Sequence, residues 1–373
     1  MKILHISPSF YPATYWGGPI WSTKAICDGV AQQPGVALQV LTTDAAGPDR
    51  QTRVTPEPLP YPVRYTRRIA GHAIAPGLLA RLPQAVAWAD VVHLTGTYSF
   101  PTLPALACAR ALGKPLIWSP RGALQATADW SDAPRRHTKQ LFEYLAQFLR
   151  GADVTLHVTS DAEARQSTQR MGEIRTVMIP NSVAIPPAAP RSTRRSSRLL
   201  FLGRLHPKKG LDLLCAAMAG LPAHVHLDVY GTGDAAYIAQ LKQECGPRIH
   251  FHGHADGVAK ERAFADADLF VLPSHSENFG IAIAEALAHG VPVLTTTQTP
   301  WQRLDSIGCG ACIDLKASDL AQEINGLLGR DLGAMGVRGR AWMQQEFSST
   351  AMIARFVEFY QQAAVRRTTA VPV

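Results

Sequence analysis

Residues 269–287 read LFVLPSHSENFGIAIAEAL, an apolar strand-like run followed by a polar turn and then a helical pattern. Glu277 lies in the turn, and Glu285 lies inside a helix that we expect to begin near Gly280. In a parallel α/β sheet, ligands bind at such strand-to-helix junctions, and the open end of the helix offers N–H groups to an anion. The segment therefore predicts a site that holds hydroxyl groups beside a phosphate.

The N-terminal half of the chain alternates short β-rich runs with helical patterns. We expect strands at residues 2–6, 37–41, 91–94, 116–118, 154–158 and 177–179. Helical patterns fall near residues 19–32, 101–112, 134–150 and 160–171. Strands that alternate with helices are typical of a doubly wound parallel sheet, so this half predicts one Rossmann-like domain.

The alternation stops at residues 184–198, which are rich in proline, serine and arginine and show no apolar period. Such a composition is typical of a linker or an exposed loop. The pattern then restarts, with strands expected at residues 199–203, 226–230, 249–252, 269–272 and 291–294. Helices are expected between them near residues 209–219, 234–245, 257–266 and 280–289. The second half therefore predicts a second Rossmann-like domain.

Together these patterns predict an α/β protein with two doubly wound domains that face a central cleft. The expected parts are an N-terminal domain at 1–183, a linker at 184–198, a C-terminal nucleotide-binding domain at 199–348, and a helix with its tail at 349–373. The final helix carries one apolar stripe, made of Met352, Phe356, Phe359 and Tyr360. A stripe of this kind indicates an amphipathic helix, which we expect to pack back on the N-terminal domain.

Length and charge narrow the class of protein. The chain has 373 residues and a formal net charge of +8. Its length allows two domains with a core each, and its charge favours anionic partners or serves solubility alone. The first residues read as a strand rather than a signal peptide, and no apolar run approaches the ~20 residues that cross a bilayer. We therefore expect a cytoplasmic location.

The sequence predicts no metal site. Cys309 and Cys312 form a C-x-x-C pattern without the second pair or the histidines that a zinc site needs. We interpret them as structural cysteines where a loop enters a strand, with a redox motif as the alternative. Asp266 and Asp268 form a D-x-D pattern, but they lie at a helix-to-strand turn, on the sheet edge opposite the ligand side.

Five polar segments of the second domain follow its expected strands on the side where ligands bind. They are residues 203–210, 231–233, 251–254, 277–285 and 295–301. Arg204 and Lys209 flank a proline turn, so both cations could converge on one pyrophosphate. Each residue alone has a structural alternative, since Arg204 could be a solvated rim residue and Gly231 could serve a tight turn. Glu285, on an apolar helix, is the hardest to explain without a ligand or an ion partner.

The motifs in these segments resemble those of the retaining glycosyltransferases of family four, which have the GT-B fold. The second domain carries GRLHPKKG at 203–210 and VLPSHSENFG at 271–280, with the two glutamates spaced E-x7-E. The first domain adds WGGP at 16–19, DVVHL at 90–94, PRG at 120–122, TSDAE at 159–163 and IPN at 179–181. The resemblance covers nearly the whole chain and looks closest to enzymes of bacterial lipopolysaccharide and capsule assembly.

The resemblance implies a role for each matching residue of the donor site. Among the catalytic residues, Arg204 and Lys209 would bind the donor pyrophosphate, and Glu277 would hold hydroxyls of the transferred sugar. Glu285 would accept hydrogen bonds from the ribose. The other donor-binding residues that it implies are Gly17, Gly18, Gly203, Gly231, His254, Asn278, Phe279 and Gly280. No metal and no cofactor are implied, because fixed cations and a helix N-terminus would stabilise the leaving diphosphate.

Two departures from the family pattern concern the first domain. Thr95 stands where relatives often have the second histidine of His-x-His, which leaves open whether His93, Thr95 or Gly96 lines the sugar pocket. Arg121 of the PRG motif is a further candidate for the sugar or acceptor pocket. Ser182 replaces the glycine of Pro-Asn-Gly at the domain junction, where we expect it to change a turn more than the chemistry.

The predicted activity is retaining transfer of a hexose from a nucleoside-diphosphate donor, of UDP or GDP type, to a glycan or lipid-linked glycan. The expected setting is the synthesis of a cell-surface polysaccharide. A GT-B nucleotide-sugar epimerase and a soluble synthase with a small acceptor are alternatives with the same fold. A non-catalytic nucleic-acid binder is disfavoured, because the basic clusters lack a recognised nucleic-acid module.

Three basic clusters, at 64–68, 135–139 and 191–198, favour peripheral contact with an anionic membrane on its inner face. Each basic residue near such a surface contributes about 1 kcal/mol. Trp130 and the helical residues 141–145 could add apolar contact, with a helix packed in the core as the alternative.

Overall fold

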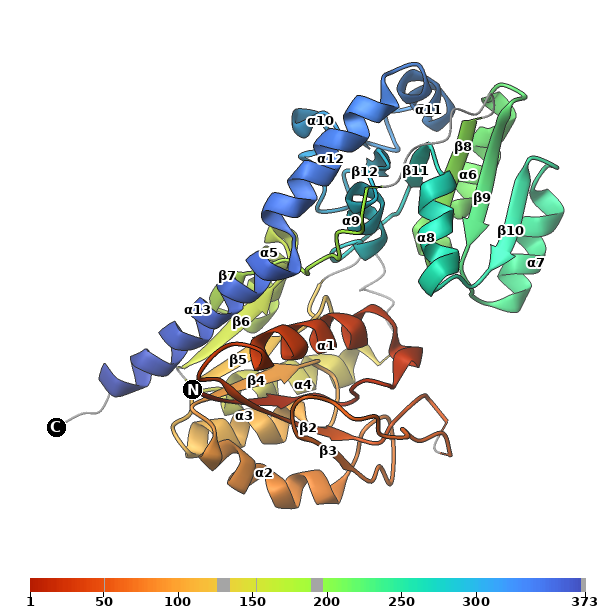
Figure 1. The fold of residues 1–373 in the computed structure, drawn as a ribbon. Coiled ribbons are helices and arrows are strands. Elements are labelled where there is room, and N and C mark those ends of the chain that lie inside the picture. Colours follow the sequence, from red (N-terminus) through yellow and green to blue (C-terminus); the bar gives the residue numbers. More distant parts are fainter. Residues whose placement is uncertain (50, 126–134, 152, 189–196, 370–373) are drawn as a thin grey trace. The chain divides into compact units, whose positions relative to one another are not determined.

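The computed structural model describes residues 1–49, 51–125, 135–151, 153–188 and 197–369. It divides the chain into two units, of which the first is Met1–Ser182 with Ser349–Val373 and the second is Val183–Ser348 (Figure 1). Each unit contains one parallel sheet, which confirms the predicted α/β class with two Rossmann-like domains. Most of the predicted linker, and Trp130, lie outside the described residues.

The first unit has a seven-stranded sheet in the order β3-β2-β1-β4-β5-β6-β7. Its strands are β1 (Lys2–Ile6), β2 (Ala37–Thr43), β3 (Val63–Thr66), β4 (Val91–Thr95), β5 (Leu116–Ser119), β6 (Val154–Val158) and β7 (Arg175–Met178). All but β3 correspond to predicted strands, and β7 begins two residues earlier than predicted. The prediction lacks β3 because Pro58, Pro60 and Pro62 precede it and give the stretch the composition of a loop.

Helices of the first unit lie on both faces of its sheet. They are α1 (Gly18–Ala31), α2 (Pro76–Trp88), α3 (Thr102–Ala111), α4 (Arg136–Leu149), α5 (Asp161–Met171) and α13 (Ser349–Thr369). The prediction lacks α2, which contains Pro83 in its interior, a position where proline normally breaks a helix. Successive strand residues face opposite cores. Ile3 and Val91 contact the core under α1 and α13, and Leu4 and Val92 contact the core under α2 to α5.

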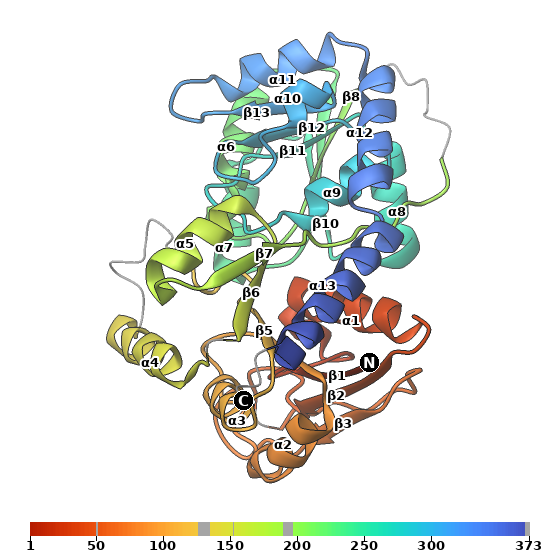
Figure 2. The same ribbon diagram turned by 90° about the vertical axis from the view of Figure 1, so that its left-hand side faces the viewer.

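The C-terminal helix α13 is part of the first unit and packs on α1 (Figure 2). Its predicted stripe is buried in that unit's core, together with Ile26 and Val30 of α1. Gly29 permits the close approach, because a Cβ at this position would collide with the side chain of Ile353.

The second unit has a six-stranded parallel sheet in the order β10-β9-β8-β11-β12-β13. Its strands are β8 (Ser197–Leu202), β9 (Val225–Tyr230), β10 (Ile249–Gly253), β11 (Leu269–Leu272), β12 (Val293–Thr296) and β13 (Gly310–Ile313). Its helices are α6 (Leu211–Ala217), α7 (Ala235–Glu244), α8 (Gly257–Asp266), α9 (Ile281–Ala288), α10 (Leu304–Ile307), α11 (Leu320–Leu328) and α12 (Leu332–Glu346). The prediction gives no bounds for β13, where it indicates only that a loop at Cys309 and Cys312 enters a strand, and it lacks the three helices α10 to α12.

Strand β12 begins and ends two residues later than predicted. The Val291 N–H donates to the Ala286 carbonyl at 2.8 Å, so Val291 still belongs to the turn that follows α9. Pro292 comes next and has no N–H to give to a sheet. The apolar character of Val291 is therefore used in the core rather than in strand pairing.

Cys309 and Cys312 lie just before and within β13, as the sequence predicts. Burial raises the pKa of Cys309 to about 12 and that of Cys312 to about 11. Both are therefore protonated thiols near neutral pH, which fits structural cysteines better than reactive ones. Among the described residues, no helix combines the length and the apolarity that crossing a bilayer requires.

Candidate functional site

The strand order of the second unit places two predicted site segments side by side. Strand β8 pairs with β9 on one side and with β11 on the other, so the winding direction reverses between β8 and β11. The loops that follow these two strands leave the sheet at the same carboxyl edge. Such a switch point is where ligands bind in open α/β sheets.

Close backbone contact joins the two loops. Gly210 has φ of +68°, and a Cβ on it would overlap the carbonyl oxygen of Pro273. The His275 N–H donates to the Lys208 carbonyl at 2.9 Å. The Ser274 hydroxyl donates to the same carbonyl at 3.1 Å. The glycine that ends GRLHPKKG is therefore needed because the loop after β8 is pressed against the loop after β11.

This contact brings Lys209 and Glu277 together as an ion pair. The Glu277 side chain is 9% exposed and that of Lys209 is 22% exposed. The Glu277 backbone is held as well, since its N–H donates to the Gln298 carbonyl at 3.3 Å. A carboxylate this buried requires a charged or hydrogen-bonding partner. Lys209 meets that requirement and keeps both charges at the carboxyl edge.

Glu285 has a partner that the sequence motifs do not indicate. It lies on α9, and its Oε1 is 2.7 Å from Nζ of Lys260 on α8. Lys260 belongs to no motif and lies 25 residues earlier in the chain, so sequence spacing gives no signal for the pair. The acid on an apolar helix is thus explained by an ion partner, and no hydrogen bond from another described residue involves its second carboxylate oxygen.

The start of α9 is open to an anion. Gly280 precedes the helix in a left-handed conformation, with φ of +76°, and no side chain caps the helix. The first N–H groups of a helix lack intrahelical partners, so they offer donors and a partial positive charge beside Glu277.

The residues between Glu277 and Gly280 are anchored by an aromatic contact. Phe279 is buried against Trp301, whose Nε1–H donates to the Phe279 carbonyl at 2.5 Å. Oδ1 of Asn278 is buried and finds no hydrogen-bond partner in the described part of the chain. Phe279 therefore fixes the loop, and the Asn278 side chain has hydrogen-bonding capacity to spare.

The remaining predicted donor residues of this unit are not part of the Lys209–Glu277 ion pair. Arg204 is exposed and makes no hydrogen bond or ion pair with other described residues. A Cβ on Gly231 would overlap the Gly203 carbonyl, so close packing of the two loops is enough to require glycine there. His254 is exposed, with Nε2 3.5 Å from an Asp256 carboxylate oxygen. The structure joins Lys209 to Glu277 but leaves Arg204 and His254 outside that pair.

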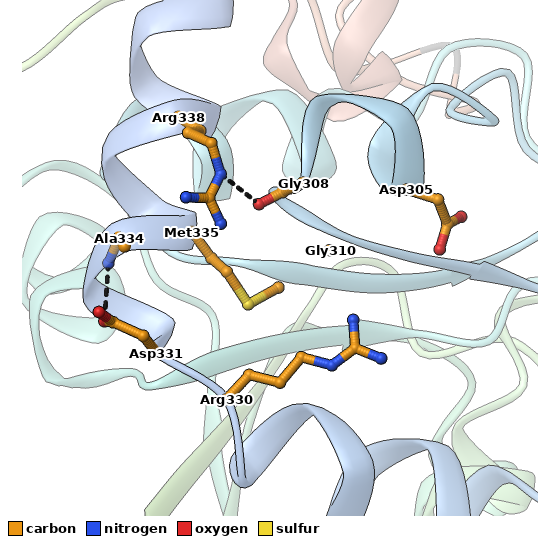
Figure 3. Close-up of a pocket in the computed structure, with 8 residues that line it drawn as sticks. All are labelled: Asp305, Gly308, Gly310, Arg330, Asp331, Ala334, Met335 and Arg338. Carbon is orange, nitrogen blue, oxygen red and sulfur yellow. Dashed lines mark hydrogen bonds between the residues drawn. The ribbon is translucent and has the colours of Figure 1, made fainter.

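Two other features of the second unit lie away from the carboxyl edge. A cavity of about 390 Å³ lies beside Gly308, Asp305 and Arg338, at the amino end of β13, and no predicted site residue lines it (Figure 3). The D-x-D pattern lies between α8 and β11, where an Asp268 oxygen accepts from the Arg198 N–H at 2.8 Å. No cluster of three or more potential metal ligands occurs in the ranges that the structure describes.

In the first unit, His93 and Thr95 are interior residues. His93 is fully buried, with Nδ1 2.6 Å from the Tyr360 hydroxyl and Nε2 2.6 Å from the Ser119 hydroxyl. The Thr95 hydroxyl is 3.0 Å from Nε2 of His5. Both predicted pocket residues therefore already have partners, and His93 connects β4 to α13.

Burial determines the protonation state of three histidines in this core, His5, His93 and His157. It lowers the pKa of His5 and of His157 to about 3, and it lowers that of His93 well below its usual value. The rings are therefore neutral near pH 7, and hydrogen bonds hold them in place. His157 bonds to Ser119 and to the Ile179 carbonyl, at 2.6 and 2.8 Å. The sequence analysis did not single out His5 or His157, and it placed Tyr360 only in the apolar stripe of the final helix.

Arg121 differs from His93 and Thr95, whose side chains already have hydrogen-bond partners. It follows β5 with φ of +56°, a conformation that is strained for a residue other than glycine. Its Nη1 donates to Oδ1 of Asn181 at 2.9 Å. Nε and Nη2 are buried without a partner among the described residues, and burial lowers the pKa of the guanidinium. These two nitrogens form one edge of the guanidinium, the edge that can bind a carboxylate or phosphate bidentately.

The glycines before α1 differ in what their positions require. Gly17 has φ of +69°, and neither Gly17 nor Gly18 would bring a Cβ within 4 Å of another group. Gly17 is therefore required by its backbone conformation. Gly18 begins α1 at the carboxyl side of β1 and leaves its backbone open.

Family models match both units of the chain. The model described as Glycosyltransferase Family 4 matches residues 16–185, and the one described as Glycosyl transferases group 1 matches residues 196–330. A phosphatidyl-myo-inositol mannosyltransferase of Mycolicibacterium smegmatis is 29% identical over 49% of this chain and 50% of its own length. A D-inositol 3-phosphate glycosyltransferase of Xylanimonas cellulosilytica is 31% identical over 46% and 44%. The chain thus spans about half the length of the curated relatives it matches.

Solved structures match the whole chain at low identity. HepE of Anabaena, crystallised with UDP, gives a TM-score of 0.74 at 19% identity and covers 97% of this chain and 100% of its own. WaaG, described as a glycosyltransferase involved in lipopolysaccharide biosynthesis, gives 0.67 at 18% and covers 99% and 100%. These likenesses define the class of the fold as GT-B. With both units matched by glycosyltransferase models, the chain belongs to glycosyltransferase family 4.

Proposed function

We propose that the protein is a retaining hexosyltransferase that uses a nucleoside-diphosphate sugar. The acceptor is a hydroxyl of a glycan or lipid-linked glycan, in the synthesis of a cell-surface polysaccharide. The observation that carries the proposal is the Lys209–Glu277 pair beside the uncapped start of α9. A cation and free N–H groups suit a diphosphate, while a carboxylate suits the hydroxyls of a sugar.

In the proposed reaction, the charge that develops on the leaving diphosphate is met by fixed groups. Lys209, the exposed Arg204 and the N–H groups of α9 supply positive charge where the donor's bond breaks. Glu277 accepts from hydroxyls of the transferred sugar, with Asn278 beside it. Glu285 accepts from the ribose. The departing phosphate takes the acceptor's proton on the same face, so retention needs no separate base.

On the acceptor side we propose Arg121 as the residue that contacts the ligand. Its unpartnered guanidinium edge could take an oxygen-rich group. His93 and Thr95 then act at one remove, because their polar atoms are already occupied by Tyr360, Ser119 and His5. Gly17 and Gly18 would bring backbone N–H groups toward the donor phosphates.

The relatives point to two different nucleobases. A Mycobacterium tuberculosis relative is named as GDP-mannose-dependent, whereas the HepE structures contain UDP. A thermal-shift screen against uridine, guanosine and adenosine diphosphates tests the donor class, because a bound nucleotide stabilises the native state. The proposal predicts stabilisation by the uridine or the guanosine compound. No shift with any of the three would contradict it.

The same-fold alternatives make different products from the donor. A nucleotide-sugar epimerase would convert labelled donor without an acceptor, and a soluble synthase would glycosylate a small molecule. The transferase proposal predicts that the labelled donor is not epimerised when acceptor is absent, and that its sugar is transferred when a glycan acceptor is added. The new glycosidic bond of the product would then have the anomeric configuration of the donor.

We also propose that the enzyme is cytoplasmic and makes peripheral contact with the inner face of an anionic membrane. The observation that favours it is an exposed apolar stripe on α4. The stripe consists of Leu141, Tyr144, Leu145 and Phe148, which are 58%, 68%, 37% and 68% exposed. Basic residues at 135–139 form the N-cap and the first turn of this helix. An apolar stripe beside basic residues is typical of helices that lie in a membrane interface.

A further inference from the structure

Lys260 lies at the contact between α8 and α9 and has no role in the reaction proposed above. Lys260 reaches across from α8 and bonds Oε1 of Glu285 at 2.7 Å. Within the described chain, no hydrogen bond takes up the other oxygen, Oε2. The side chains of Lys260 and Glu285 are 29% and 21% exposed, so the pair can be reached by a ligand.

The two helices do not need this ion pair to stay together. Nε2 of His289, the residue that caps the C-terminal end of α9, lies 2.7 Å from a carboxylate oxygen of Glu261 on α8. Its ring also stacks on Phe264, with the ring centroids 4.5 Å apart. A partly exposed ion pair contributes no more than about 1 kcal/mol to stability. Loss of Lys260 should therefore leave the fold intact, which allows its role at the site to be tested separately.

The pair repeats the arrangement of Lys209 and Glu277. In both cases a carboxylate of the segment from β11 to α9 is matched by a lysine from another element. An unmatched carboxylate at Glu285 would repel the diphosphate that the site is proposed to bind. A lysine at one oxygen offsets this repulsion and fixes the orientation of the carboxylate.

We propose that Lys260 is a positioning residue for donor recognition, holding Glu285 by Oε1 so that Oε2 accepts hydrogen bonds from the ribose hydroxyls. The inference rests on the proposed function and adds a specificity residue to the same site. It predicts that the preference for ribose over deoxyribose depends on Lys260 as well as on Glu285.

The test measures dissociation constants calorimetrically for uridine and guanosine diphosphates and for their 2′,3′-dideoxy forms. The wild type should bind one ribonucleotide about tenfold or more tightly than its dideoxy form, because the lost hydrogen bonds involve a charged acceptor. Glu285→Gln and Lys260→Gln should both lose most of this preference. Lys260→Arg, which keeps the charge, should retain it.

Lys242→Gln is the matched control. Lys242 lies in the last turn of α7 and its ammonium sits 5.6 Å from the centre of the Phe251 ring, away from the carboxyl edge. Its replacement should leave the ribose preference unchanged. Thermal unfolding of each variant checks that the fold is intact.

The outcomes separate this inference from the donor site itself. If Lys260→Gln keeps the full preference while Glu285→Gln loses it, the role of Lys260 is refuted and the donor site stands. If the preference survives in both variants, Glu285 does not recognise the ribose and the inference falls with it. If the wild type binds neither diphosphate, the proposed function is refuted as well.

Discussion

The ion pair between Glu277 and Lys209 determines which role the carboxylate is suited for. The spacing of Glu277 and Glu285 allows an acid and a base, but in the structure a lysine faces each carboxylate. A carboxylate that is ion-paired with a lysine accepts hydrogen bonds, so it suits the hydroxyls of a sugar better than proton donation. In the proposed reaction, the positive charge that a leaving diphosphate needs would come from Lys209, Arg204 and the start of α9.

Replacement of Glu277 tests this assignment at the residue scale. We expect Glu277→Gln to lower kcat/KM for sugar transfer by about 100-fold or more, because it removes a charged acceptor and leaves Lys209 unpaired. The measurement is the release of nucleoside diphosphate in the presence of acceptor. The control is Arg303→Gln, which breaks an exposed pair with Glu346 in the same unit and should change turnover little. Equal losses in both variants would contradict the assignment.

The sequence predicts which residues occupy the carboxyl edge but not how they pair. Lys209 and Glu277 stand out because their motifs follow two strands that a doubly wound sheet makes neighbours. Lys260 does not stand out, because it lies on a separate helix and belongs to no motif. His93 likewise suggests a pocket residue until Tyr360, 267 residues later in the chain, occupies its Nδ1. Pairings over such distances depend on tertiary packing and leave no local pattern.

At the scale of elements, the loop from β8 to α6 is held by close backbone contact. We expect Gly210→Ala to lower the free energy of unfolding by roughly 2 kcal/mol or more, since the residue combines positive φ with an overlap on Pro273. Transfer should fall too, because Lys209 would move. Urea denaturation and the turnover assay measure the two effects.

Gly326→Ala provides the comparison for that substitution. Gly326 lies within α11, and a Cβ there would meet nothing within 4 Å. Alanine should stabilise this helix by up to about 1 kcal/mol. A Gly210→Ala variant as stable as Gly326→Ala would show that the two loops are not held by the contact described.

Helix α4 carries a prediction of its own. Replacement of Tyr144 and Phe148 by serine should weaken sedimentation with anionic vesicles by about tenfold or more, since two exposed aromatic side chains would no longer enter the interface. Binding should also fall with added salt. Val337→Ser, which removes a 70% exposed residue of α12, is the control. Vesicle binding that is unchanged by the double replacement and by salt would contradict membrane contact through α4.

The sequence predicts the elements whose apolar residues form a clear pattern, and it misses elements that contain or follow prolines. The strands at β1, β6 and β11 have the predicted bounds, since apolar runs there are bordered by polar turns. Helix α2 is missed because Pro83 interrupts its pattern, and β3 because prolines precede it. Both are held by tertiary contacts: Leu78 and Leu82 of α2 are buried in the core of the first unit, and β3 pairs with β2. Packing of this kind overrides local propensity.

For the molecule as a whole, the buried histidines of the first unit make stability depend on pH. The pKa of His5 and of His157 is about 3 in the folded protein, against about 6.5 in an unfolded chain. As pH falls below about 6.5, the unfolded chain takes up protons that the folded unit refuses until about pH 3. Each histidine should therefore lower the free energy of unfolding by up to about 1.4 kcal/mol per pH unit in this window.

Hydrogen exchange of amides in β4 and β6, followed by mass spectrometry, reports on the first unit alone. Their protection should be full near pH 7, after correction for intrinsic exchange rates, and should fall between pH 6.5 and 5. His226 and His250 of the second unit, whose rings stack 5.8 Å apart, have no comparable burial. Protection in the first unit that does not change over this window would contradict neutral, buried histidines.

The central claim is that the carboxyl edge of the second unit binds the diphosphate of a nucleotide-sugar donor. The most direct measurement is calorimetric titration of wild type, Lys209→Met and Arg303→Gln with uridine and guanosine diphosphates. One of the two diphosphates should bind the wild type and Arg303→Gln alike, and Lys209→Met about tenfold or more weakly, because a charge-assisted contact to phosphate is lost. Failure of both diphosphates to bind the wild type, or equal affinity in Lys209→Met, would contradict the claim.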